Sequence, residues 1–430
     1  MRQVDFPHIF RVRQRFVSRG IADLESAVRR EFDRIGLRDR IRPGETAAVT
    51  AGSRGIAAYA RILRAVVQYL RESGAEPFIV PAMGSHGGGT AEGQREVLAR
   101  YGITDETMGC PIRASMETVV VGRAAEGFDV HFDRFAAQAD HVVVVNRVKP
   151  HTQFTGPIES GLMKMLLIGL GKHRGAEIYH RAVEDFGFDR IVRSVGRMVL
   201  ERCRILCGLG LVEDAFDETG HVEALPPDQF ETREPALLEL AKQWMPRLPF
   251  DDAHILLIDR LGKDISGAGI DTNVIGRKYH YHHAAENERP RIRYICVRGL
   301  TEATHGNAIG IGFAEFCRSE VIRAMDVQAT RINALTAGHV AAGMLPFDYP
   351  TDREMLTHAL ANIGLTPPPQ SRLMWIADTS HLSELECSAA YWEEAQARSD
   401  LEVLTAPRPL PFDAAGNLPS VHAFSPSDAG

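Results

Sequence analysis

The sequence predicts an α/β protein made of two α/β domains whose sheets are largely parallel. Short apolar segments alternate with amphipathic helical segments along most of the chain. This alternation is the pattern of strand–helix–strand units, in which helices join parallel strands. A chain of 430 residues also exceeds what one hydrophobic core normally serves. We therefore expect two domains, with the active site in the cleft between them.

The first predicted domain covers residues 1–248. Its run of valines at 141–146 is continuous rather than alternating, which is typical of a strand buried on both faces. The other apolar segments are bounded by glycine, proline and polar residues, as strands and helices in such units are. The expected strands are 46–51, 77–83, 141–146 and 204–212, and the expected helices are 56–74, 90–102, 157–170, 188–202 and 234–245.

The second predicted domain covers residues 249–404. Two prolines within 244–252 end the preceding helical pattern, and a new cycle of strands then begins at 253–259, 291–297 and 372–378. The last segment, 405–430, is rich in Pro, Ser, Ala and Gly, which favours an extended tail.

Composition excludes several classes of partner. The net charge of −7 gives no electrostatic case for nucleic acid or an anionic membrane. We expect neither a membrane span nor a signal peptide, because no apolar stretch is long enough for either. The six scattered cysteines fit reduced thiols in a cytoplasmic protein. The sequence does not fix the oligomeric state, and a homo-oligomer is one option.

Chemistry-bearing residues follow three consecutive predicted strands. Arg54 follows the first, His86 lies in a glycine-rich loop after the second, and His151 follows the third. Ligands of open α/β sheets bind beyond the carboxyl ends of the strands, so we expect these residues at one edge. Each residue alone could be a local structural group; the three together favour a shared site.

Lys164 lies within the apolar run Leu-Met-Lys-Met-Leu-Leu-Ile. Such a lysine either extends along the helix to reach water or serves as an amine nucleophile with a lowered pKa. His180, further along, could be a surface histidine or a metal ligand. From these residues alone both questions stay open.

The second domain offers a polar, glycine-rich loop at 262–278, after its first strand. Lys263, Arg277 and Lys278 in this region are candidates to contact a substrate. The adjacent His280, His282 and His283 resemble a metal site in composition, but we interpret them as a surface or interface feature.

Three of these motifs, taken in order, carry a family resemblance. The stretches "GSHGGGTAEGQREVL" and "KPHTQFTGPIESGLMK", followed by a histidine sixteen residues after Lys164, resemble the lactate racemase family that uses a nickel-pincer nucleotide. The similarity covers most of residues 40–215 and is weaker beyond them.

The resemblance implies a cofactor and a role for each matching residue. The cofactor is pyridinium-3,5-bisthiocarboxylic acid mononucleotide carrying nickel, joined to Lys164 through a thioamide, with His180 as the protein ligand of the metal. Planar four-coordinate sites suit nickel(II). The resemblance assigns acid–base catalysis to His86 and His151 and substrate or cofactor binding to Arg54. The glycine-rich turn, with Gly87 and Gly88, would meet the cofactor phosphate.

The implied activity is that of an isomerase: racemisation or epimerisation of a 2-hydroxy acid by hydride abstraction to the tethered cofactor through a 2-keto acid. Cofactor-synthesis enzymes would be partners. The substrate stays open, because no carboxylate precedes Arg54 in "TAGSR", where racemases of the family often have one. The residues alone also allow a zinc or iron hydrolase or lyase built on His86, His151 and His180, or a non-catalytic nucleotide-binding module.

Overall fold

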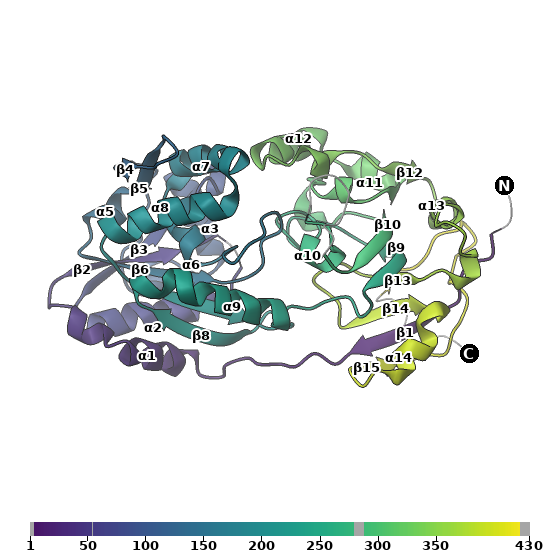
Figure 1. The fold of residues 1–430 in the computed structure, drawn as a ribbon, viewed down its shortest axis with the longest axis horizontal. Coiled ribbons are helices and arrows are strands. Elements are labelled where there is room, and N and C mark those ends of the chain that lie inside the picture. Colours follow the sequence, from purple (N-terminus) through teal and green to yellow (C-terminus); the bar gives the residue numbers. More distant parts are fainter. Residues whose placement is uncertain (1–3, 54, 279–287, 422–430) are drawn as a thin grey trace. The chain divides into compact units, whose positions relative to one another are not determined.

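The structure is a computed structural model that describes residues 4–53, 55–278 and 288–421 (Figure 1). It divides into two compact units. One is Val17–Met245, and the other combines the described parts of residues 1–16 and 246–430. Both units are α/β with largely parallel sheets, which confirms the predicted fold class.

The unit formed by residues 17–245 has a five-stranded sheet in the order β3-β2-β6-β7-β8. Its strands are parallel except β8, which pairs with β7 in the antiparallel direction. A separate two-stranded hairpin pairs β4 with β5. The strands are β2 (Thr46–Ala51), β3 (Glu76–Pro81), β4 (Thr118–Arg123), β5 (Asp129–Asp133), β6 (His141–Arg147), β7 (Ile205–Glu213) and β8 (Thr219–Leu225).

Helices cover both faces of this sheet (Figure 1). Val142 and Val144 of β6 enter the core formed with α6 to α9, whereas Val143 and Val145 enter the core formed with α1 and α2. Burial on both faces explains the unbroken run of valines. The helices are α1 (Leu24–Arg34), α2 (Tyr59–Glu72), α3 (Ala91–Arg100), α4 (Asp105–Met108), α5 (Arg134–Gln138), α6 (Leu162–Lys164), α7 (Lys172–Phe186), α8 (Phe188–Arg202) and α9 (Phe230–Trp244).

The helix expected at 157–170 is shorter and less regular than the sequence predicts. It begins only at Leu162, as the short α6, and continues as a π-helical turn, η3 (Met165–Gly169). Before it, Ser160 forms an antiparallel bridge with Lys149 rather than a helical turn. Single π-helical turns inside helices are frequent at functional sites.

The other unit has an eight-stranded sheet in the order β12-β11-β10-β9-β13-β14-β1-β15. Strands β9 to β13 are parallel, and β14, β1 and β15 add antiparallel neighbours. Its elements are β1 (Ile9–Gln14), β9 (Asp252–Ile258), α10 (Thr272–Ile275), β10 (Arg291–Val297), β11 (Phe316–Arg318), α11 (Ser319–Ala324), α12 (Val327–Thr336), β12 (Phe347–Tyr349), α13 (Asp352–Ala361), β13 (Leu373–Ile376), β14 (Glu384–Ser388), α14 (Trp392–Ala397) and β15 (Leu401–Val403).

Strand β1 belongs to this second sheet, although the sequence assigned residues 1–248 to the first domain. It lies between β14 and β15, and the Arg11 guanidinium donates to the buried Glu386 carboxylate at 2.9 Å. Strand partners far apart along the chain cannot be recognised from a local pattern, so the sequence placed this segment with its neighbours.

The segment predicted as an extended tail, 405–430, packs against the second unit as far as it is described. It contains little regular structure, but Leu410, Leu418 and Val421 are buried. The backbone N–H of Val421 donates to Asp259 at 2.8 Å, and Arg298 donates to the Pro419 carbonyl at 2.9 Å.

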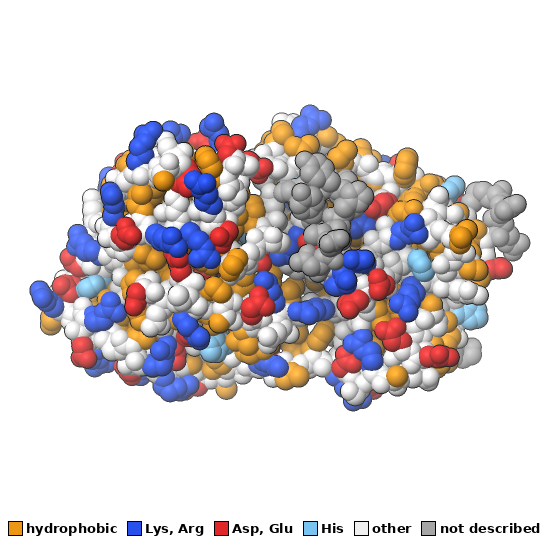
Figure 2. Space-filling model, viewed as in Figure 1, with side chains coloured by type: hydrophobic (Ala, Val, Ile, Leu, Met, Phe, Trp, Pro, Cys, Tyr) orange, Lys and Arg blue, Asp and Glu red, His pale blue; other side chains and the backbone are white. Residues whose placement is uncertain are grey.

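The described part of the chain contains no helix that is both long and apolar enough to cross a membrane. Basic and acidic side chains are interspersed over the face of the molecule drawn in Figure 2. All six cysteines are unpaired, and five of them are buried.

The position of β1 generates a prediction. Deleting residues 1–16 removes the strand that pairs with both β14 and β15. The amides of β14 and β15 should therefore lose protection from hydrogen exchange, while those of β2, β6 and β7 keep it. Hydrogen exchange followed by mass spectrometry of the full-length and truncated chains measures both. Equal protection of β14 and β15 in the two proteins would show that β1 is dispensable.

Candidate active site

Loops from the carboxyl ends of β2, β3 and β6 meet above helix α6. The Ala82 N–H donates to the Ala51 carbonyl at 2.8 Å, which joins the ends of β3 and β2. The Asn146 amide, at the end of β6, donates to the Gly161 carbonyl at 2.9 Å, just before α6. These three loops begin at the same edge of the sheet, because β3, β2 and β6 are parallel neighbours.

His86 lies in the glycine-rich loop after β3 and is exposed. Its Nδ1 is hydrogen-bonded to the Ser53 hydroxyl, which belongs to the loop after β2. Because a hydroxyl both donates and accepts, this bond allows either neutral tautomer of the ring. Arg54, the next residue along, lies outside the described residues.

The glycines of this loop differ in what they do. Gly87, Gly88 and Gly89 all have a φ of about +66°, which strains other residues. A Cβ on Gly87 would lie 2.5 Å from the Gly93 carbonyl carbon, so Gly87 is required for packing against α3. A Cβ on Gly88 would meet nothing within 4 Å, which leaves Gly88 as the candidate for close approach to a ligand.

The loop after β6 holds the His151 ring in a defined orientation. Its Nδ1 accepts the backbone N–H groups of Gln153 and Phe154 at 3.0 and 3.1 Å, and the ring stacks on Phe154. A neutral ring in this setting carries its proton on Nε2. The His151 backbone N–H donates to Glu159 at 2.7 Å, and buried Glu159 pairs with Lys242 at 3.2 Å.

Lys164 ends α6 and is half-buried among fully buried neighbours such as Met163 and Met165. The structure leaves this amine partly accessible, which both interpretations of the sequence allow. His180 lies on α7, two turns beyond its first residues. Burial lowers the pKa of the His180 imidazole, and the nearby charge of Lys164 lowers it further. The charge of Lys164 therefore acts on His180, and both effects favour the neutral form of the imidazole.

The fully buried lysine is Lys172, which no pattern in the sequence indicated. Its Nζ donates to the Pro81 carbonyl at 2.5 Å and to Gln94 Oε1 at 3.3 Å, and it pairs with Asp133 at 3.1 Å. Burial lowers its pKa, and Asp133 opposes that effect. Gln94 in turn donates to the carbonyls of Gly84 and His86. This buried cluster thus fixes the loop that presents His86.

Glu234, on α9, caps the start of α6. Its Oε2 accepts the Met163 N–H at 2.9 Å, and its Oε1 has no hydrogen-bond partner among the described residues. A Cβ on Gly161 would lie 2.2 Å from that Oε1, so only glycine fits there. Complete burial raises the pKa of Glu234 to about 7. No sequence pattern connects residue 234 with a helix start seventy residues earlier.

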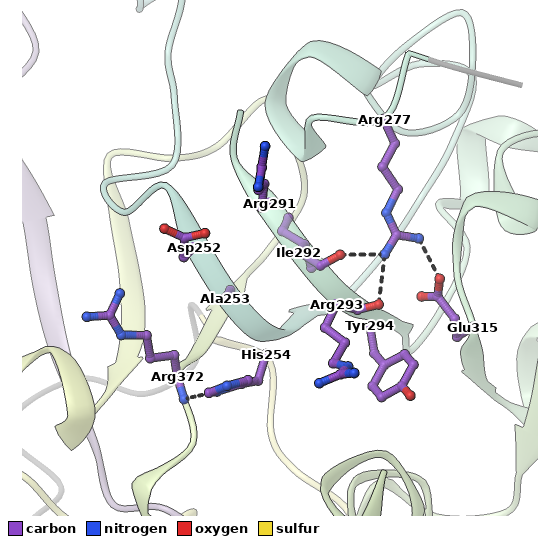
Figure 3. A pocket seen from close by; sticks show the side chains of 10 residues that line it. All are labelled: Asp252, Ala253, His254, Arg277, Arg291, Ile292, Arg293, Tyr294, Glu315 and Arg372. Atoms are coloured by element: carbon purple, nitrogen blue, oxygen red, sulfur yellow. Dashed lines mark hydrogen bonds and ion pairs between the residues drawn. The ribbon is translucent and has the colours of Figure 1, made fainter. Parts of the chain in front are cut away.

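The candidate substrate-binding side chains of the second unit are hydrogen-bonded or buried within that unit. Lys263 Nζ donates to the Gly267 carbonyl and to Asn333 Oδ1. Arg277 is 3% exposed and bonds Glu315 at 2.7 Å (Figure 3) together with three backbone carbonyls. Lys278 is buried as well. His280, His282 and His283 lie outside the described residues, so their interpretation stays a prediction.

The described residues contain no group of three or more His, Cys, Asp or Glu side chains placed to hold a metal ion. His86, His151 and His180 are all described and form no such group.

Comparisons with known proteins agree with this fold. The chain belongs to the family described as a domain of unknown function, DUF362, whose model matches residues 49–276. Among solved structures, the chain is similar to the lactate racemase apoprotein from Thermoanaerobacterium thermosaccharolyticum. The TM-score is 0.54 over 86% of this chain and 94% of that chain, at 14% sequence identity. Identity this low shows the fold alone. No curated protein sequence matches the chain.

Glu234 generates a prediction about stability and pH. Its pKa is raised in the folded state, from 4.5 to about 7, so the folded protein binds the proton more tightly than the unfolded chain. The contribution to stability is complete below pH 4.5 and is lost as the pH rises through 7, by about 3 kcal/mol. Glu234→Gln keeps the capping oxygen without the charge. It should therefore reduce the change in the free energy of unfolding between pH 5 and pH 8, measured by denaturant titration.

Glu239→Gln, on the same helix but exposed, is the matched control. Its free energy of unfolding should change with pH as that of the wild type does. If the free energy of unfolding of Glu234→Gln also changes with pH as in the wild type, Glu234 is not the titrating group.

Proposed function

We propose that the protein is a nickel-dependent racemase or epimerase of a 2-hydroxy acid. The observation that carries the proposal is that Lys164, at the end of α6, is near enough to His180 of α7 for its charge to lower the pKa of the buried imidazole. The fold shared with a lactate racemase apoprotein supports it. On this proposal the protein works in the cytoplasm, where cofactor-synthesis enzymes act on it.

The residues present fit a nickel-pincer nucleotide. The half-buried Lys164 offers an amine for covalent attachment, and His180 offers a neutral imidazole, the form that binds metals. Gly88, with open space above it, offers a close approach for a phosphate. When bound, this group accepts and returns the α-hydride of the substrate.

The two loop histidines would handle the hydroxyl proton, and the structure gives them different starting roles. His86 can present an unprotonated Nε2, because its Nδ1 can donate to the Ser53 hydroxyl. His151 is held with Nδ1 as an acceptor, so its Nε2 donates a hydrogen bond to the substrate oxygen. His86 is thus the base for one enantiomer, and His151 must give up its Nδ1 contacts to serve as the base for the other.

Arg54 and the second-unit residues remain part of the proposal as substrate contacts. Among these, Lys263 and Arg277 would have to exchange existing bonds to bind a carboxylate. The identity of the 2-hydroxy acid is therefore left to experiment.

The proposal predicts a covalent adduct. Protein produced together with the cofactor-synthesis enzymes should carry added mass on Lys164, seen by intact and peptide mass spectrometry. Lys164→Ala should abolish the adduct, whereas Lys149→Ala, a nearby control, should keep it. His180→Ala should keep the adduct and lose nickel, because it removes a ligand of the metal and not the attachment point.

The loaded protein should racemise at least one member of a panel of 2-hydroxy acids with retention of an α-deuterium label. His86→Ala or His151→Ala should slow the reaction by about 100-fold or more. An unmodified Lys164 in protein produced together with the cofactor-synthesis enzymes would contradict the cofactor assignment. If the adduct is present but no 2-hydroxy acid of the panel is racemised, the racemase assignment is contradicted.

A further inference from the structure

The loops that follow β2 and β3 both pack against the turn η3. A Cβ on Gly52, in the first loop, would lie 3.2 Å from Met165 Cε. A Cβ on Gly84, in the second loop, would lie 3.2 Å from the Ile168 carbonyl oxygen. Both loops therefore lie against the turn that directly follows Lys164.

Helix α3 contacts both loops through two side chains. Gln94 is fully buried and donates to the carbonyls of Gly84 and His86 at 2.9 and 3.3 Å. Tyr101, the residue directly after the helix, donates its hydroxyl to the Ser53 carbonyl at 3.0 Å. Residues seven positions apart leave a helix on the same side. One side of α3 therefore sets the position of the two loops relative to each other.

Ser53 and His86 meet where these loops come together. The Ser53 hydroxyl is hydrogen-bonded to His86 Nδ1. The preceding N–H, that of Gly52, donates to the buried Tyr59 hydroxyl at 2.8 Å. The Ser53 carbonyl accepts from Tyr101. The backbone of Ser53 is therefore held by bonds that do not involve the imidazole.

A hydroxyl at Nδ1 can act on an imidazole in two ways. If it accepts the Nδ1 proton, the neutral ring has an unprotonated Nε2, and the bond persists when Nε2 takes up a second proton. If it donates to Nδ1, the neutral ring carries its proton on Nε2, and protonation of Nδ1 breaks the bond. Only the first arrangement orients the ring both before and after Nε2 accepts a proton.

We propose that Ser53 and Tyr101 are positioning residues for His86. Ser53 accepts the Nδ1 proton, which leaves Nε2 as the basic nitrogen, and Tyr101 holds Ser53 within reach of the ring. The use of this base on a 2-hydroxy acid rests on the racemase proposal. The tautomer of the ring does not, because it is a property of the protein without cofactor.

The first test measures that tautomer by NMR in the full-length protein without cofactor. Long-range proton–nitrogen spectra of protein with isotope-labelled histidine distinguish the tautomers, and His86→Gln identifies the signals. In alkaline buffer, where the ring is neutral, wild-type His86 should carry its proton on Nδ1. Ser53→Ala and Tyr101→Phe should each shift the proton toward Nε2, the tautomer that a histidine side chain favours in water.

Two further variants serve as controls for this measurement. Ser53→Thr keeps a hydroxyl at the same position and should keep the wild-type tautomer. Arg100→Gln changes an exposed residue beside Tyr101 and should also leave the tautomer unchanged. Circular dichroism checks that each variant folds.

The second test uses the cofactor-loaded enzyme. On this proposal neither positioning side chain touches the substrate, so Ser53→Ala and Tyr101→Phe should lower kcat and leave KM within about 2-fold. A loss of about 10-fold in kcat matches the net value of one hydrogen bond. Ser53→Thr should restore most of the activity lost in Ser53→Ala.

A wild-type His86 with its proton on Nε2, or a tautomer that Ser53→Ala leaves unchanged, would overturn the inference whatever the activity. An unchanged tautomer in Tyr101→Phe, or failure of that variant to fold, would overturn the part assigned to Tyr101. A raised KM with unchanged kcat in Ser53→Ala would show that Ser53 binds substrate instead. If the loaded wild type racemises nothing, the proposed function fails, and the NMR result still decides whether Ser53 and Tyr101 position His86.

Discussion

The arrangement of the candidate active site depends on one buried charge, the Lys172 ammonium. It is fully buried and bonds the end of β3, Gln94 on α3 and Asp133 at the end of β5. Removing one member of a buried ion pair typically costs about 3–5 kcal/mol, because the remaining charge is left without a partner. Three segments that are distant along the chain are therefore held together at the base of the glycine-rich loop.

The sheet supplies the second constraint. Because β2, β3 and β6 are parallel and buried on both faces, their carboxyl ends emerge at one edge, and their loops must meet there. The loops are then fixed by different means: Ser53 bonds His86 across two of them, and Glu159 holds the backbone of His151. A rigid sheet with separately anchored loops is the arrangement that positions catalytic side chains accurately.

Much of this could be predicted from the sequence, because it follows from local patterns. The strand at 46–51 is predicted with its observed bounds, and strand order predicts that the loops bearing His86 and His151 begin at one edge of the sheet. What could not be predicted depends on partners far apart in the chain. Lys164 stood out as a charge in an apolar run, yet the fully buried lysine is Lys172, whose polar neighbours in sequence gave no sign of it.

The same reason explains the other differences. Glu234 caps a helix 71 residues away along the chain, and β1 pairs with strands at the far end of the sequence. Local periodicity identifies elements, whereas buried polar contacts between elements become visible only once the fold is known.

The most direct test of the central claim is hydrogen exchange in a Lys172→Met/Asp133→Asn variant, which removes both buried charges while leaving a side-chain oxygen to cap α5. The hydrogen-bonded amides of His86 and Thr90 should lose protection, because the anchor of the glycine-rich loop is gone, while amides of the interior strand β7 keep theirs. Wild-type protection at His86 and Thr90 in the folded variant would contradict the claim that Lys172 positions this loop.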